Sequence, residues 1–125
     1  MSVPDNLKYT TEHEWVRVKG DEIVIGVTEF AQGELGDVVF IEIETEGETL
    51  AKGETFGTIE AVKTVSDLYM PLDGEIVEVN SALEDTPELV NSEPFEGGWM
   101  IRVKISDPSQ LDDLMDADAY RALIG

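Results

Sequence analysis

Short strand-like runs separated by glycine-containing turns recur along most of this sequence. Residues 15–19 (WVRVK) and 101–105 (IRVKI) alternate between apolar and polar side chains, as strands with one buried face do. Residues 22–27 (EIVIGV), 37–44 (DVVFIEIE) and 74–80 (GEIVEVN) are also rich in strand-forming residues. Short strands that follow one another across tight turns pair antiparallel. The pattern therefore predicts a small antiparallel β domain, built as a sandwich or a barrel.

Three other segments lack the strand pattern. Residues 28–36 (TEFAQGELG) predict a short helix, with Thr28 as its N-cap and Gly36 as its left-handed end. Residues 106–125 predict two short helices packed on the sheet, because their apolar residues recur at helical spacing. Residues 81–99 are expected to form a polar loop, since they contain two prolines and many polar side chains. A chain of 125 residues suffices for one hydrophobic core, so we expect a single domain over residues 1–125.

The chain is strongly acidic: 28 Asp and Glu against 8 Lys and Arg give a formal net charge of −20. Such a charge repels nucleic-acid phosphates and anionic lipids, so we expect neither as a partner. The longest apolar runs are far shorter than the roughly 20 residues of a membrane span, so we also expect no membrane association. One hypothesis for the acidity is a high-salt cytoplasm, where a Debye length of about 3 Å at about 1 M salt screens repulsion between surface charges.

Cysteine is absent, which excludes disulfides and thiolate chemistry and fits a reducing compartment. The first fifteen residues lack the basic and apolar regions of a secretory signal, and they lack the Arg- and Ser-rich composition of a transit sequence. We therefore expect a cytoplasmic protein. We also expect a monomer.

A catalytic centre is hard to assemble from these residues. The chain has one histidine, His13, so a site with two histidine ligands is excluded. It also lacks the spaced acidic loop of an EF-hand and the glycine-rich loops that bind phosphates. We expect neither a catalytic residue nor a metal site. His13 itself is more typical of a packed or surface residue than of a functional one.

Among the few basic residues, Lys63 has an unusual position, because its neighbours are apolar or β-branched. It follows Val62 and precedes Thr64 and Val65, between two strand-like runs. If the chain reverses at residues 62–63, these β-branched neighbours stiffen a hairpin whose tip exposes the amine. An exposed amine on a rigid base suits a lysine that an enzyme acylates. An ordinary exposed strand lysine is the alternative, because no Gly, Asn or Asp marks a turn at this tip.

Five segments of the chain resemble the family of H proteins of the glycine cleavage system. They read LKYTTEHEWV (7–16), GVTEFAQGELGDVVFIEI (26–43), EAVKTVSDLYMPLDGEIVEVN (60–80), ELVNSEPFEGGWMIRVKI (88–105) and LDDLMDADAYRALI (111–124). The resemblance implies a mainly β fold of the lipoyl/biotinyl-carrier type. This is a flattened barrel of two small antiparallel sheets with short helices, including a C-terminal helical segment. It also implies that lipoate is attached covalently to Lys63 at the tip of a hairpin.

The resemblance further implies residues that a lipoate-attaching enzyme reads. Glu60 occupies the position three residues before the lysine that such enzymes recognise in carriers of this type. Gly53 and Gly74 bracket the hairpin, where we expect them to permit close turns. One departure is Ala61, where the family usually has serine.

A cleft that shields the loaded arm is implied in the same way. Glu14 matches an acidic residue that helps to hold the amine at the end of the arm, and Asp67 and Glu12 are further candidates for this role. The chain departs from the family at Phe30 and Glu34, where relatives often carry histidines. This departure concerns the details of the cleft and not the attachment site.

By this resemblance the chain is a non-catalytic shuttle in glycine catabolism. A glycine decarboxylase that uses pyridoxal phosphate (P protein) would load an aminomethyl group onto the lipoyl arm. A tetrahydrofolate-dependent aminomethyltransferase (T protein) would take over the one-carbon unit, and a dihydrolipoyl dehydrogenase (L protein) would reoxidise the arm. The expected partners are these three enzymes and a lipoate-attaching enzyme.

Other carriers stay open as alternatives. Biotin carboxyl carriers usually flank the lysine with methionines, whereas this chain has Val62 and Thr64 there. Lipoyl domains of 2-oxoacid dehydrogenase complexes usually have an aspartate before the lysine and lack the C-terminal helical pieces. A binding module with an unmodified Lys63 is a third reading. A carrier that relays lipoate to other proteins would need the same hairpin as a glycine cleavage shuttle.

Overall fold

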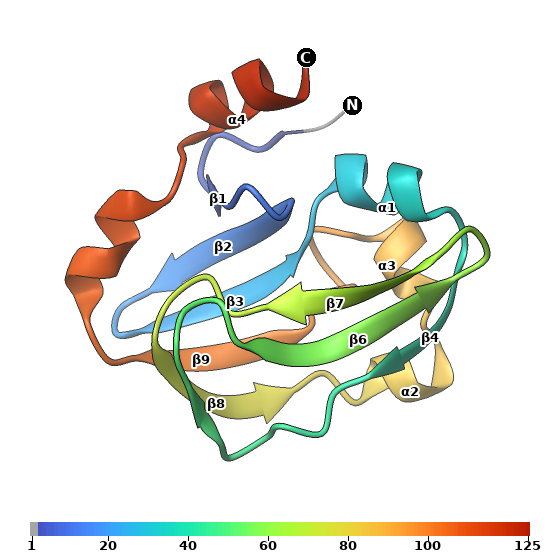
Figure 1. The fold of residues 1–125 in the computed structure, drawn as a ribbon, viewed down its shortest axis with the longest axis horizontal. Coiled ribbons are helices and arrows are strands. Elements are labelled where there is room, and N and C mark those ends of the chain that lie inside the picture. The colour runs from blue at the N-terminus through green and yellow to red at the C-terminus, as the bar shows by residue number, and fades with distance from the viewer. Residues whose placement is uncertain (1–2) are drawn as a thin grey trace.

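Two antiparallel sheets form the fold in the computed structural model, which describes residues 3–125 (Figure 1). The larger sheet has six strands in the order β1-β2-β3-β9-β8-β5, which span Lys8–Tyr9, Glu14–Lys19, Glu22–Val27, Ile101–Ile105, Gly74–Val79 and Thr49–Leu50. The smaller sheet has the order β4-β6-β7, with strands over Val38–Glu42, Thr55–Ala61 and Val65–Tyr69. Every pair of neighbouring strands is antiparallel. The prediction of a mainly β fold with two antiparallel sheets is confirmed.

The hydrophobic core joins the two sheets. In β9, Ile101, Val103 and Ile105 are buried whereas Lys104 is exposed, as the alternation in the sequence predicted. β9 pairs with both β3 and β8, so it is a central strand of the larger sheet. The smaller sheet contributes its own buried residues to the same cluster, namely Val38, Ile41, Phe56, Ile59, Ala61 and Leu68.

Helix α1 (Glu29–Leu35) follows β3 and confirms the helix predicted over residues 28–36. The side-chain oxygen of Thr28 accepts a hydrogen bond from the N–H of Ala31 (3.2 Å) and so caps the helix. The helix ends at Gly36, whose φ of +80° agrees with a glycine stop. Its ψ of −157° differs from the left-handed conformation that we expected, and this combination is open essentially to glycine alone.

The polar loop predicted over residues 81–99 contains two helices, so this prediction was wrong. Helices α2 (Ala82–Asp85) and α3 (Leu89–Ser92) have about one turn each. Each helix buries one apolar side chain, Leu83 in α2 and Val90 in α3. A single turn with one buried residue is too short to produce a recognisable helical period in the sequence.

The C-terminal segment contains one α-helix, α4 (Ala117–Ile124), and one 3₁₀ helix, η1 (Pro108–Asp113). The second of the two predicted helices is therefore confirmed, and the first is a 3₁₀ helix. Tyr120 of α4 is fully buried and stacks on Tyr9 of β1 with ring centroids 4.6 Å apart. As Figure 1 shows, α4 lies beside the N-terminal strand and not over the smaller sheet.

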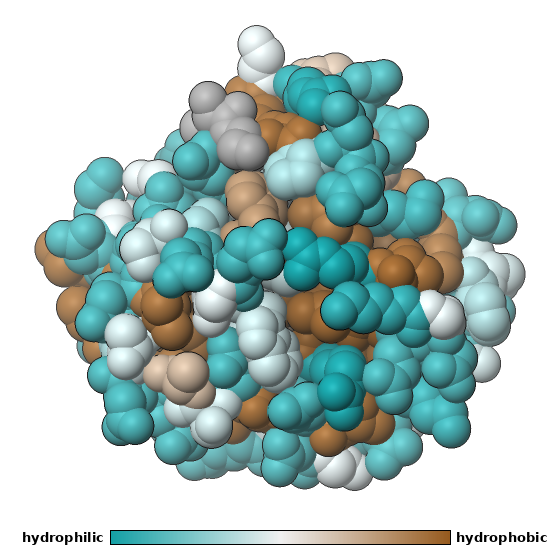
Figure 2. Space-filling view, turned by 180° about the vertical axis from the view of Figure 1, so that it is seen from behind, coloured by the Kyte–Doolittle hydropathy of each residue, from teal (hydrophilic) through white to brown (hydrophobic). Residues whose placement is uncertain are grey.

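The surface of the molecule opposite the view of Figure 1 is mostly hydrophilic (Figure 2). Hydrophobic residues show there as separate patches between polar ones. In the part of the chain that the structure describes, no helix has both the length and the apolar composition that crossing a bilayer requires.

The two glycines expected to permit turns have different environments. Gly53 has a φ of +89° in the turn before β6, and open space surrounds the position that a Cβ would occupy. Gly74 begins β8 instead of forming a turn. A Cβ on Gly74 would overlap Cγ1 of Val103 and lie 2.6 Å from the carbonyl oxygen of Lys104. Gly74 thus allows β8 and β9 to approach each other closely.

A Gly74→Ala substitution is expected to lower the free energy of unfolding by about 3 kcal/mol, because β9 must move to admit the methyl group. The matched control is Gly53→Ala, which meets no atoms and is expected to cost only about 1 kcal/mol for its positive φ. Urea denaturation of both variants measures the difference. A Gly74→Ala protein as stable as Gly53→Ala would show that the contact between β8 and β9 is not tight.

Candidate functional site

The hairpin of β6 and β7 carries Lys63 at its tip. Glu60 and Val65 form the last residue pair of the ladder, and the N–H of Ala61 donates to the carbonyl of Thr64 (2.9 Å). The chain therefore reverses at residues 62–63, so Lys63 lies at a hairpin tip and not within a strand. The tip lies at the end of the molecule where α1 and α3 are found (Figure 1).

A neighbouring segment of the chain holds this tip in place. The N–H of Val62 donates to the carbonyl of Asp37 (2.9 Å), and the N–H of Lys63 donates to the carbonyl of Leu35 (3.4 Å). Between these two acceptors lies Gly36, where a Cβ would come within 3.2 Å of Cγ of Lys63. The connection from α1 to β4 thus supports the backbone of the tip and leaves room for the stem of Lys63. These contacts explain how a turn without Gly, Asn or Asp is fixed.

The amine of Lys63 is available for reaction. The side chain is exposed, and within residues 3–125 its Nζ makes neither a hydrogen bond nor an ion pair. Acylation would turn this strongly hydrated cation into a neutral amide without breaking a contact of the folded chain. Because the backbone of the tip is fixed and the amine is free, an enzyme can reach the amine from outside the molecule.

A cavity of about 150 Å³ lies beside the hairpin and brings the three predicted cleft residues together. Glu12, Glu14 and Asp67 all line it. Its apolar lining comes from β3, α1, β6 and β7, through Val27, Ala31, Leu35, Ile59 and Leu68. Because Leu35 also accepts the hydrogen bond from the backbone of Lys63, the cavity begins next to Lys63.

Glu14 differs from the other two acids in its environment. Its side chain is only 2% exposed, whereas Glu12 and Asp67 are exposed. Its oxygens accept hydrogen bonds from the N–H of Tyr69 (3.0 Å) and the hydroxyl of Thr10 (3.4 Å). Burial raises the pKa of the Glu14 carboxyl from 4.5 to about 8. At neutral pH this carboxyl is therefore mostly protonated, unlike the anion that the sequence suggested.

His13, for which the sequence favoured a packed or surface position, also lines the cavity. It has a φ of +64°, which is uncommon outside glycine. Its Nδ1 lies 3.0 Å from the hydroxyl of Tyr120, which in turn lies 2.7 Å from the hydroxyl of Thr28. This network links the C-terminal helix to the cavity wall. No pattern in the sequence could reveal it, because Tyr120 follows His13 by 107 residues.

The remaining predicted positions are spread over the molecule. Glu34 lines the same cavity, whereas Phe30 packs against the ring of His13 with centroids 4.8 Å apart. Glu60 is exposed on the smaller sheet close to the tip. Gly53 lies at the opposite end of β6, where it lines a second cavity of about 470 Å³ that also includes Glu12 and Glu14. Gly74 lies in the larger sheet, so the structure does not bring these two glycines to Lys63.

Comparisons with known proteins agree on one family. The sequence model of the glycine cleavage H-protein family matches residues 7–125. A glycine cleavage system H protein of Bacteroides thetaiotaomicron is 59% identical over 124 residues, which cover 99% of this chain and 98% of that protein. One of Staphylococcus carnosus is 55% identical over 125 residues, which cover 100% of this chain and 99% of that protein.

A solved structure supports the same assignment. The crystal structure of a glycine cleavage system H protein from Mycobacterium marinum matches this fold with a TM-score of 0.90 and 36% sequence identity. The match covers 98% of this chain and 99% of that one, so both sheets and the terminal helix are included. The chain therefore belongs to the glycine cleavage H-protein family, whose members are carrier components and not enzymes.

Proposed function

We propose that this chain is a single-domain lipoylated shuttle of a glycine cleavage system, with lipoate bound as an amide to Lys63. The observation that carries the proposal is the free amine of Lys63 on a hairpin tip that the connection from α1 to β4 holds in place. The cavity beside it, with apolar walls and four carboxyl groups, fits an uncharged arm that ends in an amine.

The residues of the chain would place and protect the arm. When bound, lipoate supplies a dithiolane whose sulfur accepts the aminomethyl group. The apolar walls of the cavity, among them Leu35 and Ile59, would exclude water from the loaded end. Asp67 and Glu12 would attract a positively charged amine, and Glu14 would do so once it has lost its proton. Because the chemistry belongs to the cofactor, a chain without cysteine meets all these requirements.

The proposed partners are the enzymes that use such an arm in sequence. They are a glycine decarboxylase, an aminomethyltransferase that depends on tetrahydrofolate, and a dihydrolipoyl dehydrogenase. A lipoate-attaching enzyme must act before them, and Glu60 is the residue that we propose it reads. Contacts with three successive enzymes must be transient, and the net charge of −20 favours partners with basic patches at low salt.

The intact mass of the protein tests this proposal. After expression in lipoate-competent cells, or incubation with a lipoate–protein ligase, lipoate and ATP, the mass is expected to rise by one lipoyl group. Peptide mapping is expected to place the group on Lys63. A biotin increment would indicate a biotin carrier instead, and an unmodified protein under both conditions would refute a carrier role.

A further inference from the structure

Exposed apolar residues gather around the tip of the hairpin. Among residues 3–125, six large apolar side chains are exposed, and four of them lie here. They are Val39 (52% exposed), Phe40 (48%), Val62 (72%) and Val65 (63%), which we call the tip patch. Exposed apolar side chains that gather in one region are characteristic of surfaces that other proteins cover, and this chain otherwise carries a net charge of −20.

The strand register places part of this patch in one row. Phe40 of β4 pairs with Glu60 of β6, and Glu60 pairs with Val65 of β7. Residues that are directly opposite in neighbouring strands lie on the same face of a sheet. The carboxylate of Glu60 is therefore flanked by two exposed apolar side chains on the outer face of the smaller sheet.

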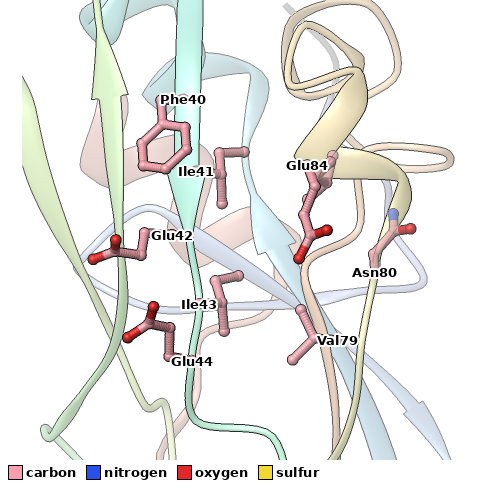
Figure 3. A pocket seen from close by; sticks show the side chains of 9 residues that line it. Phe40, Ile41, Glu42, Ile43, Glu44, Val79, Asn80 and Glu84 are labelled. Carbon is pink, nitrogen blue, oxygen red and sulfur yellow. The ribbon is translucent and has the colours of Figure 1, made fainter.

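Figure 3 shows which way the side chains of β4 and of the residue after it point. All four of the residues 40–43 border a groove of about 250 Å³, but Ile41 and Ile43 turn toward Val79 on its far wall, whereas Phe40 and Glu42 point to the other side of the chain. The apolar side chains that the core requires are thus supplied by Ile41 and Ile43. Phe40 is left on the outer face, where residues 3–125 leave about half of its side chain uncovered.

The charges around the tip patch are acidic. The carboxylate of Glu60 makes no hydrogen bond or ion pair within residues 3–125. Glu42 and Asp67 lie two rows away in the same sheet, on either side of Thr58. Lys63 is the only basic residue of β4, β6, β7 and the hairpin tip, and acylation would remove its charge. A complementary surface would combine apolar side chains with a cation facing Glu60.

We propose that the tip patch is the docking surface for the enzyme that acylates Lys63, which presents an apolar surface with an Arg or Lys opposite Glu60. This inference rests on the proposed function, because it names the partner of the same site. The acylating enzyme must take the Nζ of Lys63 itself into its active site. Side chains one to three residues from Lys63 therefore lie within its contact area. Once the arm is attached, the reacting sulfur is far from the tip, so the later enzymes need not cover this patch.

The initial rate of lipoylation tests the proposal. A lipoate–protein ligase first converts lipoate and ATP into lipoyl-AMP and pyrophosphate. It then joins the lipoyl carboxyl to the Lys63 amine and releases AMP and a proton. The double substitution Phe40→Ser with Val65→Thr is expected to lower this rate roughly tenfold, the factor that about 1.4 kcal/mol of lost docking free energy produces. The matched control is Val18→Thr, which changes an exposed residue (41%) on the larger sheet and is expected to leave the rate unchanged.

A second variant keeps the test valid if the double variant folds poorly. Glu60→Gln preserves the shape of the patch and removes only the charge, and it is expected to reduce both the rate and its dependence on salt. Patch variants with the same rates as the wild type would overturn the docking surface while leaving the proposed function intact. Failure of the wild type to accept lipoate would refute the proposed function itself.

The enzymes that act on the protein after lipoylation provide a final comparison between the patch variants and the wild type. Patch variants that have been lipoylated to completion are expected to be reduced by dihydrolipoyl dehydrogenase and NADH at the wild-type rate. An equal loss in lipoylation and in this reduction would contradict the assignment of the patch to the acylating enzyme alone.

Discussion

A Lys63→Arg protein is expected to show no lipoyl increment at all under conditions that modify the wild type completely. Arginine keeps the positive charge and the long stem, but its guanidinium does not lose a proton at physiological pH, so it cannot attack an activated carboxyl. The side chain of Lys63 is exposed and free of hydrogen bonds within residues 3–125. We therefore expect the free energy of unfolding to change by less than about 0.5 kcal/mol.

The matched control for this variant is Lys52→Arg. Lys52 is likewise exposed, with about half of its side chain accessible, and lies in a turn at the opposite end of β6. This protein is expected to be lipoylated to the wild-type extent, because its surroundings lack the fixed hairpin tip. Any lipoyl group found on the Lys63→Arg protein would mean that another lysine is the attachment site and would remove the basis of the proposed function.

A Glu14→Gln protein is expected to gain stability over the wild type as the pH rises. Glu14 is 2% exposed, and burial raises its pKa to about 8 in the folded protein, against 4.5 in the unfolded chain. Between these two values the folded state holds a proton that the unfolded state has released. Raising the pH through this window therefore destabilises the wild type, by about 5 kcal/mol over the whole interval. Glutamine stays neutral, so the variant does not lose this stability as the pH rises.

Urea denaturation at a series of pH values measures the effect. At pH 4 the two proteins are expected to differ little, since the amide oxygen of the substituted glutamine can accept the hydrogen bond from Tyr69 as the carboxyl does. At pH 9 the variant is expected to be the more stable one. Asp67→Asn is the matched control, because Asp67 lines the same cavity but is exposed. Parallel curves for wild type and Glu14→Gln would mean that Glu14 is ionised in the folded protein.

The protonation state of Glu14 affects how the proposed carrier would hold a charged amine. A cation brought next to Glu14 favours the charged form of the carboxyl and lowers its pKa. In the unloaded protein the cavity thus holds a mostly neutral acid at pH 7, which avoids the cost of a buried unpaired charge. The exposed Glu12 and Asp67 would supply the initial attraction for an amine.

The alternation of apolar and polar residues predicted the strands where it is regular. β9 illustrates this, because Ile101, Val103 and Ile105 are buried on one side. The same reasoning failed for residues 81–99, where α2 and α3 are each too short to show a period. It also missed the 3₁₀ character of η1, since 3₁₀ and α-helices share similar local composition at a proline-containing start.

The sequence by itself determined several of the strands, helix α1 and the position of Lys63 between two strand-like runs, because each depends on residues close together along the chain. The tertiary structure alone decided the support of the tip by Leu35 and Asp37, the protonation of Glu14 and the contact of His13 with Tyr120. It also decided that Phe40 faces outward beside Glu60. Burial, and with it the pKa and the exposed apolar area, is set by segments that are distant in sequence and meet only in the folded protein.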